Sequence, residues 1–339
     1  MINKQSLGGR ELIIKPKQYA HDKYWDCDGV NELHRQLQLG EDSFYAPYIR
    51  YLLNQPRGRL PQDWTENGLR LLDVITNKQP DDQATMNRLP PTYTTTDFQQ
   101  WVDECQGEDT SLTRHAVYQF ISRDEDTLLV PFFDMHNHSN DPEKLNTHVI
   151  KPKREGGSFV LRATRYIEPG EQIFISYNLC HPCWHDETFR GCKSFSNYGT
   201  SDIFFVYGFI EDWPQYWKYN MMLPNNEGGG DGAVIEEIEF CVVPKGDTLQ
   251  VRFIDDTVLQ TKNIAWFAEH LLRLTDLKLS MKEDREMMQS MPRYEWDMAW
   301  GYYDTLVMSI SLAVVQALDS SEDEVVNISS DDSCTATAS

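Results

Sequence analysis

The spacing of apolar residues changes along this chain, and that change constrains the fold more than any other feature of the sequence. From about residue 31 to residue 122, apolar side chains recur every three or four positions, which predicts a succession of helices. From Leu128 to Tyr177, short runs have a period of two, which predicts strands.

The pattern gives approximate bounds for each element. Helices are expected at 31–39, 43–53, 63–75, 95–105, 111–122, 264–274 and 292–318. Strands are expected at 11–15, 128–131, 159–163, 172–177, 235–243 and 248–253, with a turn at 168–170. In the second helix, Phe44, Tyr48 and Leu52 are predicted to share one face. The apolar run at 305–318 is too short to span a bilayer and indicates a core helix.

Charge and cysteine usage limit the class of protein and its partners. The formal net charge is −22, from 31 basic and 53 acidic side chains, which disfavours nucleic acid as a partner. The acidic surface either attracts a basic protein segment or serves solubility alone. Seven cysteines in so long a chain indicate free thiols in a reducing compartment. Without signal or transit character at the start, we expect a soluble intracellular protein away from membranes, in cytoplasm, nucleus or plastid.

Three polar or aromatic motifs stand out. Taken alone, residues 133–140 indicate either a hydrogen-bonded polar turn or, less well, a metal site using Asp134, His136 and His138. Taken alone, residues 167–177 and 198–209 indicate ordinary sheet core. Each motif is therefore ambiguous when it is considered without the others.

The order of the three motifs is more specific than any one of them. Asp-Met-x-Asn-His-Ser at 134–139 is followed by Pro-Gly-Glu-Gln-Ile-x-Ile-Ser-Tyr at 169–177 and by Tyr-Gly-Phe at 207–209. This order resembles the SET domains of the Rubisco large-subunit lysine methyltransferase class. The helical insertion before the Asn-His motif and the Tyr-x-x-Leu helix near Tyr303 are similar to that class as well.

The resemblance implies an α+β protein, with a β-clip fold of short sheets that contains a pseudoknot, a helical insertion, and a mixed, mainly helical C-terminal domain. The implied boundaries are 1–30 for the N-terminal SET part, 31–125 for the insertion, 126–222 for the SET core and 233–318 for the substrate-docking domain. The acidic tail at 319–339 has the composition of a disordered segment.

The resemblance also implies the reaction, which is transfer of a methyl group from S-adenosylmethionine to a protein lysine. A non-histone substrate with its lysine in a basic segment is expected ahead of a histone. A histidine acceptor, or a catalytically impaired SET-like module that only binds proteins, remains as the alternative. The chemistry needs a neutral amine in line with the methyl group, and an aromatic channel disfavours the ammonium form.

Residue roles follow from the matching positions. The resemblance implies that Asn137 and His138 bind the cofactor and that Tyr177 lies against its sulfonium and the lysine channel. It implies that Tyr207 is the catalytic tyrosine, whose hydroxyl orients the amine, and that Phe209 packs near the cofactor. A buried tyrosine bonded to a carbonyl is the ordinary alternative for Tyr207.

Three features depart from the family pattern. The arginine expected to bind the cofactor carboxylate is Arg123 or, alternatively, Arg114. The usual Gly-x-Gly strand is expected before Met1, because residues 8–14 align better with the element that follows it; the sequence is then truncated or its cofactor site incomplete. A Cys-x-x-Cys motif at Cys180 and Cys183, with Cys192 nearby, is a weak zinc candidate beside the simpler interpretation as free thiols.

Overall fold

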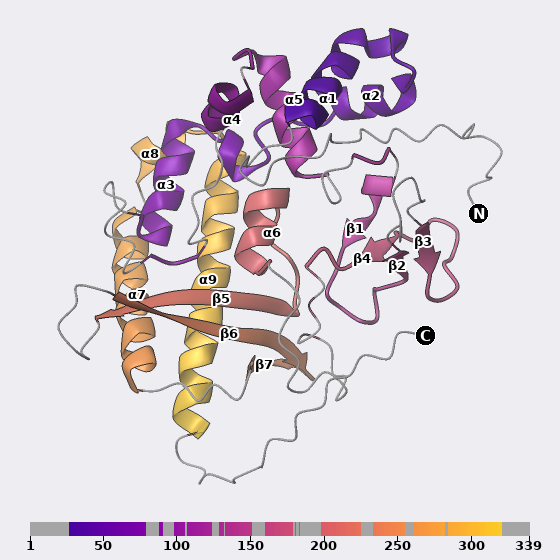
Figure 1. Cartoon of the computed structure of the whole chain (residues 1–339). Helices are drawn as coiled ribbons and strands as arrows, with labels where there is room; N and C mark the ends of the chain where they lie inside the picture. The colour runs from indigo at the N-terminus through magenta and orange to yellow at the C-terminus, as the bar shows by residue number, and fades with distance from the viewer. Residues whose placement is uncertain are drawn as a thin grey trace.

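The computed structural model describes most of the chain between residues 27 and 320 (Figure 1). The described residues are 27–78, 88–90, 98–105, 107–123, 129–131, 133–150, 160–178, 180, 183, 198–224, 233–254, 261–281 and 284–320. The strand predicted at 11–15 lies outside them, and so does the acidic tail from residue 321, whereas residues 319 and 320 of its predicted range are helical.

Four N-terminal helices build one apolar core. They are α1 (Cys27–Leu39), α2 (Ala46–Leu53), α4 (Phe98–Cys105) and α5 (Ser111–Ile121), all close to their predicted bounds. Their buried faces meet around Leu33, Ile49 and Val117. The prediction for Phe44 was wrong: it precedes α2, in the turn that the Ser43 hydroxyl closes by accepting from the Tyr45 amide, and its side chain is 68% exposed.

The middle of the chain forms two small sheets. β1 (Asn137–His138) pairs in parallel with β4 (Phe174–Ile175), and β2 (Thr147–Ile150) pairs antiparallel with β3 (Val160–Ala163). The strand predicted at 128–131 is not formed by the described residues 129–131, because the Val130 carbonyl accepts from Phe133 and starts the short helix η4 (Phe133–Met135). The strand predicted at 172–177 is reduced to β4.

The C-terminal part is a three-stranded antiparallel sheet covered by long helices (Figure 1). The strands are β5 (Gln215–Pro224), β6 (Ala233–Lys245) and β7 (Thr248–Phe253), and the helices are α6 (Thr200–Tyr207), α7 (Thr261–Met281), α8 (Arg285–Gln289) and α9 (Arg293–Ser320). Tyr219 of β5 packs edge-on against Phe267 of α7, and its hydroxyl is hydrogen-bonded to the hydroxyl of Ser309 of α9. Both helices therefore cover the same face of the sheet.

By length and composition alone, residues 293–318 of α9 pass the test for a membrane-crossing helix, because they contain an 18-residue window with a mean hydropathy of 1.2. In this fold α9 packs against α3, α7 and the sheet through buried residues such as Tyr302, Leu306 and Ile310. The Tyr302 ring lies flat on the Phe204 ring of α6, with centroids 4.5 Å apart. The predicted core helix is therefore present, and it packs against α6.

One helix of the predicted insertion belongs to the C-terminal core. α3 (Glu66–Thr76) buries Leu71, Leu72 and Ile75 against the same apolar cluster as the sheet and α9. Its N-cap Thr65 donates from its backbone N and its hydroxyl to the Glu295 carboxylate at 3.0 and 2.5 Å. The helices between 31 and 125 thus divide between two cores.

The prediction that the cysteines are free thiols was wrong for four of them. Disulfides join Cys27 to Cys105 and Cys180 to Cys183, and Cys241 is the free cysteine of the described residues. Folding brings the Cα atoms of Cys27 and Cys105 to 5.4 Å across 78 positions of sequence, a distance that suits a disulfide. Composition alone carries no information on such a contact.

Candidate functional site

The parallel pair of β1 and β4 brings the Asn-His motif beside the Ile-Ser-Tyr motif. The Asn137 amide donates to the Ile173 carbonyl at 2.8 Å, and the Ser139 amide donates to the Ile175 carbonyl at 2.9 Å. Directly after β4, the Tyr177 amide donates to Nδ1 of His138 at 2.9 Å. Backbone pairing therefore fixes the position of Tyr177 relative to His138.

The Tyr-Gly-Phe motif ends a helix and is not the sheet core that the isolated motif suggested. α6 stops at Tyr207, and Gly208 adopts a left-handed conformation with φ 75° while its amide donates to the Phe204 carbonyl at 2.9 Å. A Cβ at this position would come within 2.5 Å of the Arg59 carbonyl, so only glycine fits. The turn leaves Tyr207 and Phe209 on either side of it, both facing Tyr177.

Four of the predicted site residues form one aromatic cluster. The Tyr177 ring lies 4.6 Å from the Tyr207 ring and 5.1 Å from the His138 ring, measured between centroids. The Phe209 ring lies 5.8 Å from His138 and 6.3 Å from Tyr207. Three segments far apart in sequence thus meet in one place.

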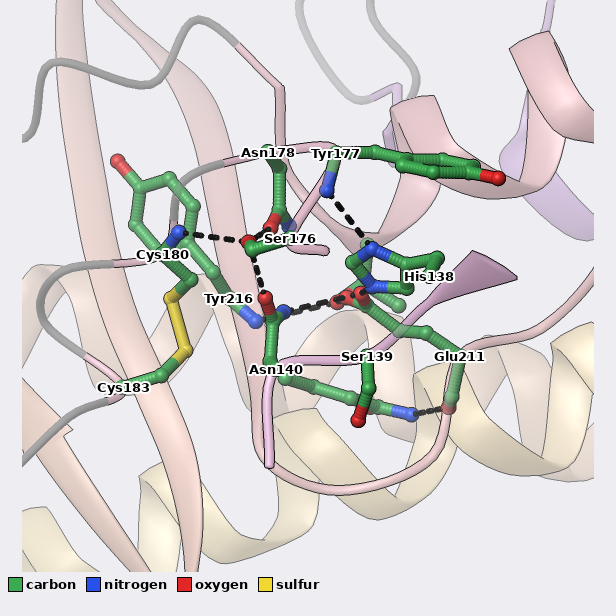
Figure 2. A network of polar contacts seen from close by, with 12 residues as sticks. His138, Ser139, Asn140, Ser176, Tyr177, Asn178, Cys180, Cys183, Glu211 and Tyr216 are labelled. Carbon is green, nitrogen blue, oxygen red and sulfur yellow. Dashed lines mark hydrogen bonds and ion pairs between the residues drawn. A yellow bond between two sulfur atoms is a disulfide. The ribbon is translucent and has the colours of Figure 1, made fainter. Parts of the chain in front are cut away.

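His138 is held in one orientation by Glu211, a residue that the sequence did not single out. Nε2 of His138 lies 2.6 Å from Oε2 of Glu211, and the two side chains are 2% and 1% exposed. Since Nδ1 accepts from the Tyr177 amide, Nε2 carries the ring proton and donates it to Glu211. Figure 2 shows Asn140, which donates to the same oxygen at 3.1 Å, and the Thr200 hydroxyl donates to the other oxygen.

The side chain of Asn137 does not join this cluster. It is exposed, and its amide donates to Oε1 of Gln172 at 3.4 Å.

The Tyr177 hydroxyl donates to the His136 carbonyl at 2.6 Å, and burial raises the pKa of Tyr177 above its ordinary value. The phenol therefore keeps its proton, and its oxygen is left as an acceptor.

Arg123, at the end of α5, has a buried acidic partner. Its guanidinium donates to Oδ2 of Asp134 at 3.1 Å and to Oε1 of Gln119 at 2.9 Å, while Tyr48 donates to the same Asp134 oxygen at 2.6 Å. Burial is the largest single influence and acts to lower the pKa of Arg123, but Asp134, Tyr51 and Tyr48 together outweigh it and the pKa is raised. The alternative, Arg114, instead pairs with Asp109 at 3.4 Å.

A cavity of about 360 Å³ lies beside the aromatic cluster. Tyr207 and Phe209 line it, together with the basic side chains of Arg57, Arg59 and Arg123. Its volume lies in the usual range for small-molecule sites. The lining suits a ligand that has both an aromatic ring and a carboxylate.

The predicted metal ligands divide into two groups. Asp134 and His138 are engaged by the partners described above, and no group of three ligands forms around them within the described part of the chain. Cys180 and Cys183 lie together beside Cys241, whereas Cys192 falls outside the described residues.

Comparison with known families gives one match, over residues 10–178. The family whose model matches this stretch is the SET domain. The SET domain together with the helices and short sheets fits the predicted α+β class, and it supports protein methyltransferase activity. SET-domain methyltransferases typically use S-adenosylmethionine. No curated protein and no solved structure matches the chain.

The SET match ends directly after the Ile-Ser-Tyr motif. It includes Arg123, His138 and Tyr177, whereas Tyr207 and Glu211 lie beyond its end. Tyr207 contacts Tyr177, and Glu211 contacts His138, so both later residues lie against the matched segment. Sequence reasoning missed Glu211 because nothing in its local pattern distinguishes a buried acid from the exposed Asp212 that follows it.

Proposed function

We propose that this protein is an S-adenosylmethionine-dependent protein-lysine N-methyltransferase of the Rubisco large-subunit methyltransferase-like class. The observation that carries the proposal is the cluster of His138, Tyr177, Tyr207 and Phe209 at the edge of the basic cavity. The SET-domain match supplies the reaction class, and the cluster supplies a place where an amine and a methyl donor can meet.

The residues around the cavity fit the cofactor. When bound, it supplies a methyl group on a positively charged sulfur. Arg57, Arg59 and Arg123 offer donors for its carboxylate, and the rings of Tyr207 and Phe209 offer apolar surface for its remainder. Arg123 uses two of its five N–H groups on Gln119 and Asp134, so the others can still donate to a ligand.

The two tyrosines suit a lysine acceptor. The amine must lose its charge before it can attack, and burial among aromatic rings favours the neutral form. The Tyr177 oxygen accepts because its own proton is committed to the His136 carbonyl. An amine N–H donated to that oxygen would leave the nitrogen lone pair free, and the Tyr207 hydroxyl would complete its orientation.

We expect the substrate to be a non-histone protein that presents its lysine within a basic segment. The net charge of −22 favours such a segment and repels phosphate backbones. Methylation should then slow as ionic strength rises, because salt screens attraction between exposed charges. A rate that does not change with salt would contradict this part of the proposal.

The decisive experiment combines cofactor titration with transfer from labelled S-adenosylmethionine. Tyr207→Phe should lower turnover by about 100-fold or more with little change in cofactor affinity. Tyr166→Phe is the matched control, because that tyrosine is 74% exposed and lies outside the cluster. Asn137→Ala should weaken cofactor binding if the family role of Asn137 applies here.

Mass spectrometry of the methylated product identifies the acceptor. A methylated lysine supports the proposal, whereas a methylated histidine would replace the acceptor and keep the cofactor site. Calorimetric titration that shows no S-adenosylmethionine binding would instead leave a SET-like protein-binding module. Unchanged turnover in Tyr207→Phe would refute the role of Tyr207.

A further inference from the structure

Three cysteine sulfurs meet in a buried pocket of the fold. Cys180 and Cys183 follow the Ile-Ser-Tyr motif, and Cys241 lies on β6. Their exposed fractions are 0%, 2% and 0%. Tyr216, Val243 and Ile254 complete the same small cluster. The cluster therefore attaches the segment after the SET motifs to the C-terminal sheet.

The spacing of the sulfurs is that of a tetrahedral metal site. Sγ of Cys241 lies 3.9 Å from Sγ of Cys180 and 3.8 Å from Sγ of Cys183. With metal–sulfur bonds of about 2.3 Å, a tetrahedral zinc ion holds neighbouring sulfurs about 3.8 Å apart. Two of the three sulfur–sulfur edges thus already have the required length. The third edge is the Cys180–Cys183 disulfide.

We propose that Cys180, Cys183 and Cys241, when reduced, bind a soft divalent cation, with Zn²⁺ as the candidate. Thiolates are the ligands that select such ions. Three protein ligands leave a fourth position for water or another donor. The disulfide is the oxidised, metal-free form of the same site. This assignment does not depend on the proposed methyltransferase activity.

The two forms interconvert by a balanced two-electron step. A small dithiol gives two electrons and two protons to the Cys180–Cys183 disulfide, whose S–S bond breaks to two thiols while the dithiol becomes a disulfide. The cation then displaces a proton from each of the three cysteines. Oxidation of Cys180 and Cys183 reverses the sequence and releases the ion.

The cysteine cluster also connects to the residues that hold His138. The Cys180 amide donates to the Ser176 hydroxyl at 3.3 Å, and that hydroxyl lies 2.7 Å from Oδ1 of Asn140. Asn140 donates to Glu211, the partner of His138, as Figure 2 shows. A continuous chain of hydrogen bonds therefore joins Cys180 to His138.

The test uses the full chain, reduced with a phosphine, stripped of metal and titrated with Co²⁺ alone. We expect one equivalent to bind with thiolate-to-cobalt charge-transfer absorption, which added Zn²⁺ abolishes. Loss of a partner outside the ligand shell already weakens metal binding 10–100-fold. Cys241→Ser and Cys180→Ser, which each remove a ligand, should therefore lower the affinity by more than about 100-fold.

Two controls locate the site. The double variant Cys27→Ser/Cys105→Ser removes two cysteines elsewhere and should bind Co²⁺ as the wild type does. Cys192→Ser should also bind; if it loses binding while Cys241→Ser retains it, the ligand set proposed here is wrong. Circular dichroism checks each fold, and Cys241→Ala replaces the serine variant if that one unfolds. Failure of the reduced wild type to bind Co²⁺ overturns the proposal.

Discussion

His138 donates a hydrogen bond to Glu211 across 2.6 Å, and both side chains are almost completely buried. Glu211 also accepts from Asn140 and Thr200, so all three of these partners are donors. A carboxylate can accept every one of these bonds, whereas an amide cannot. The orientation of the His138 ring therefore depends on the charge of one residue 73 positions away.

Glu211→Gln should destabilise the protein by about 2–3 kcal/mol, because its amide group would face a donor and leave a buried hydrogen bond unmade. Urea unfolding measures the change, and Glu143→Gln is the control because Glu143 is exposed. If cofactor binding is established, the same variant should weaken it by freeing the His138 ring. Equal stability of the two variants would refute the role of Glu211.

Arg123→Ala should lower the free energy of unfolding by about 3–5 kcal/mol, because it leaves the buried Asp134 without its cationic partner. Adding Asp134→Ala should recover part of that loss, since the unpaired acid is then removed. Arg35→Ala breaks an exposed pair with Glu32 and should lower the free energy of unfolding far less. The prediction fails if the Arg123 and Arg35 variants unfold at the same urea concentration.

Stability should fall in mild acid because of His270. Burial, with a smaller contribution from Arg273, lowers the pKa of His270 from 6.5 to about 4. Below pH 6.5, His270 binds a proton in the unfolded chain but not in the folded protein. Stability is therefore lost as the pH falls from 6.5 to about 4. The loss approaches about 3 kcal/mol.

His270→Phe preserves an aromatic ring against Trp266 and removes the titration. Unfolding in urea at pH 7 and pH 4.5 gives the acid loss for each protein, and the wild type should lose more. The difference between the two losses isolates His270 from the other titrating groups. An equal loss in both proteins would show that His270 has no part in it.

Gly68→Ala should destabilise α3 although alanine is the better helix former by about 1 kcal/mol. A Cβ at Gly68 would overlap the Glu295 carboxylate, which two bonds to Thr65 hold in place. Overpacking of this kind costs about 1–3 kcal/mol. In a Glu295→Ala background the same substitution should become neutral or stabilising; thermal unfolding of the four proteins gives the coupling.

The local pattern of apolar residues was sufficient to predict the helices and strands in which that pattern is regular. The bounds of α5, β6 and β7 agree with their predictions to within a few residues. β5 was missed even though Trp217, Tyr219 and Met221 alternate toward the core, because adjacent apolar residues at 216–217 and 221–223 break the alternation. The signal was present in the sequence, but its context obscured it.

Long-range contacts account for the features that the sequence did not predict. Glu211 is buried because β1 and α6 bring three donors to it, and Cys27 meets Cys105 because α1 and α4 share a core. Four of the site residues were named because ordered motifs resemble a known family, not because local spacing placed them together. The side chain of Asn137, by contrast, lies outside the cluster that its neighbour His138 joins.

The flat stack of Phe204 on Tyr302 joins the helix that ends in Tyr207 to the longest helix of the C-terminal sheet region. Cutting the polypeptide between β5 and β6 would expose that stack and the apolar face of α3 to water. The SET segment and the C-terminal region should therefore melt in a single cooperative transition, and neither half should be recoverable as a folded fragment. A protein that binds to α9 would therefore contact the helix against which α6 packs, and α6 is the helix that ends in Tyr207.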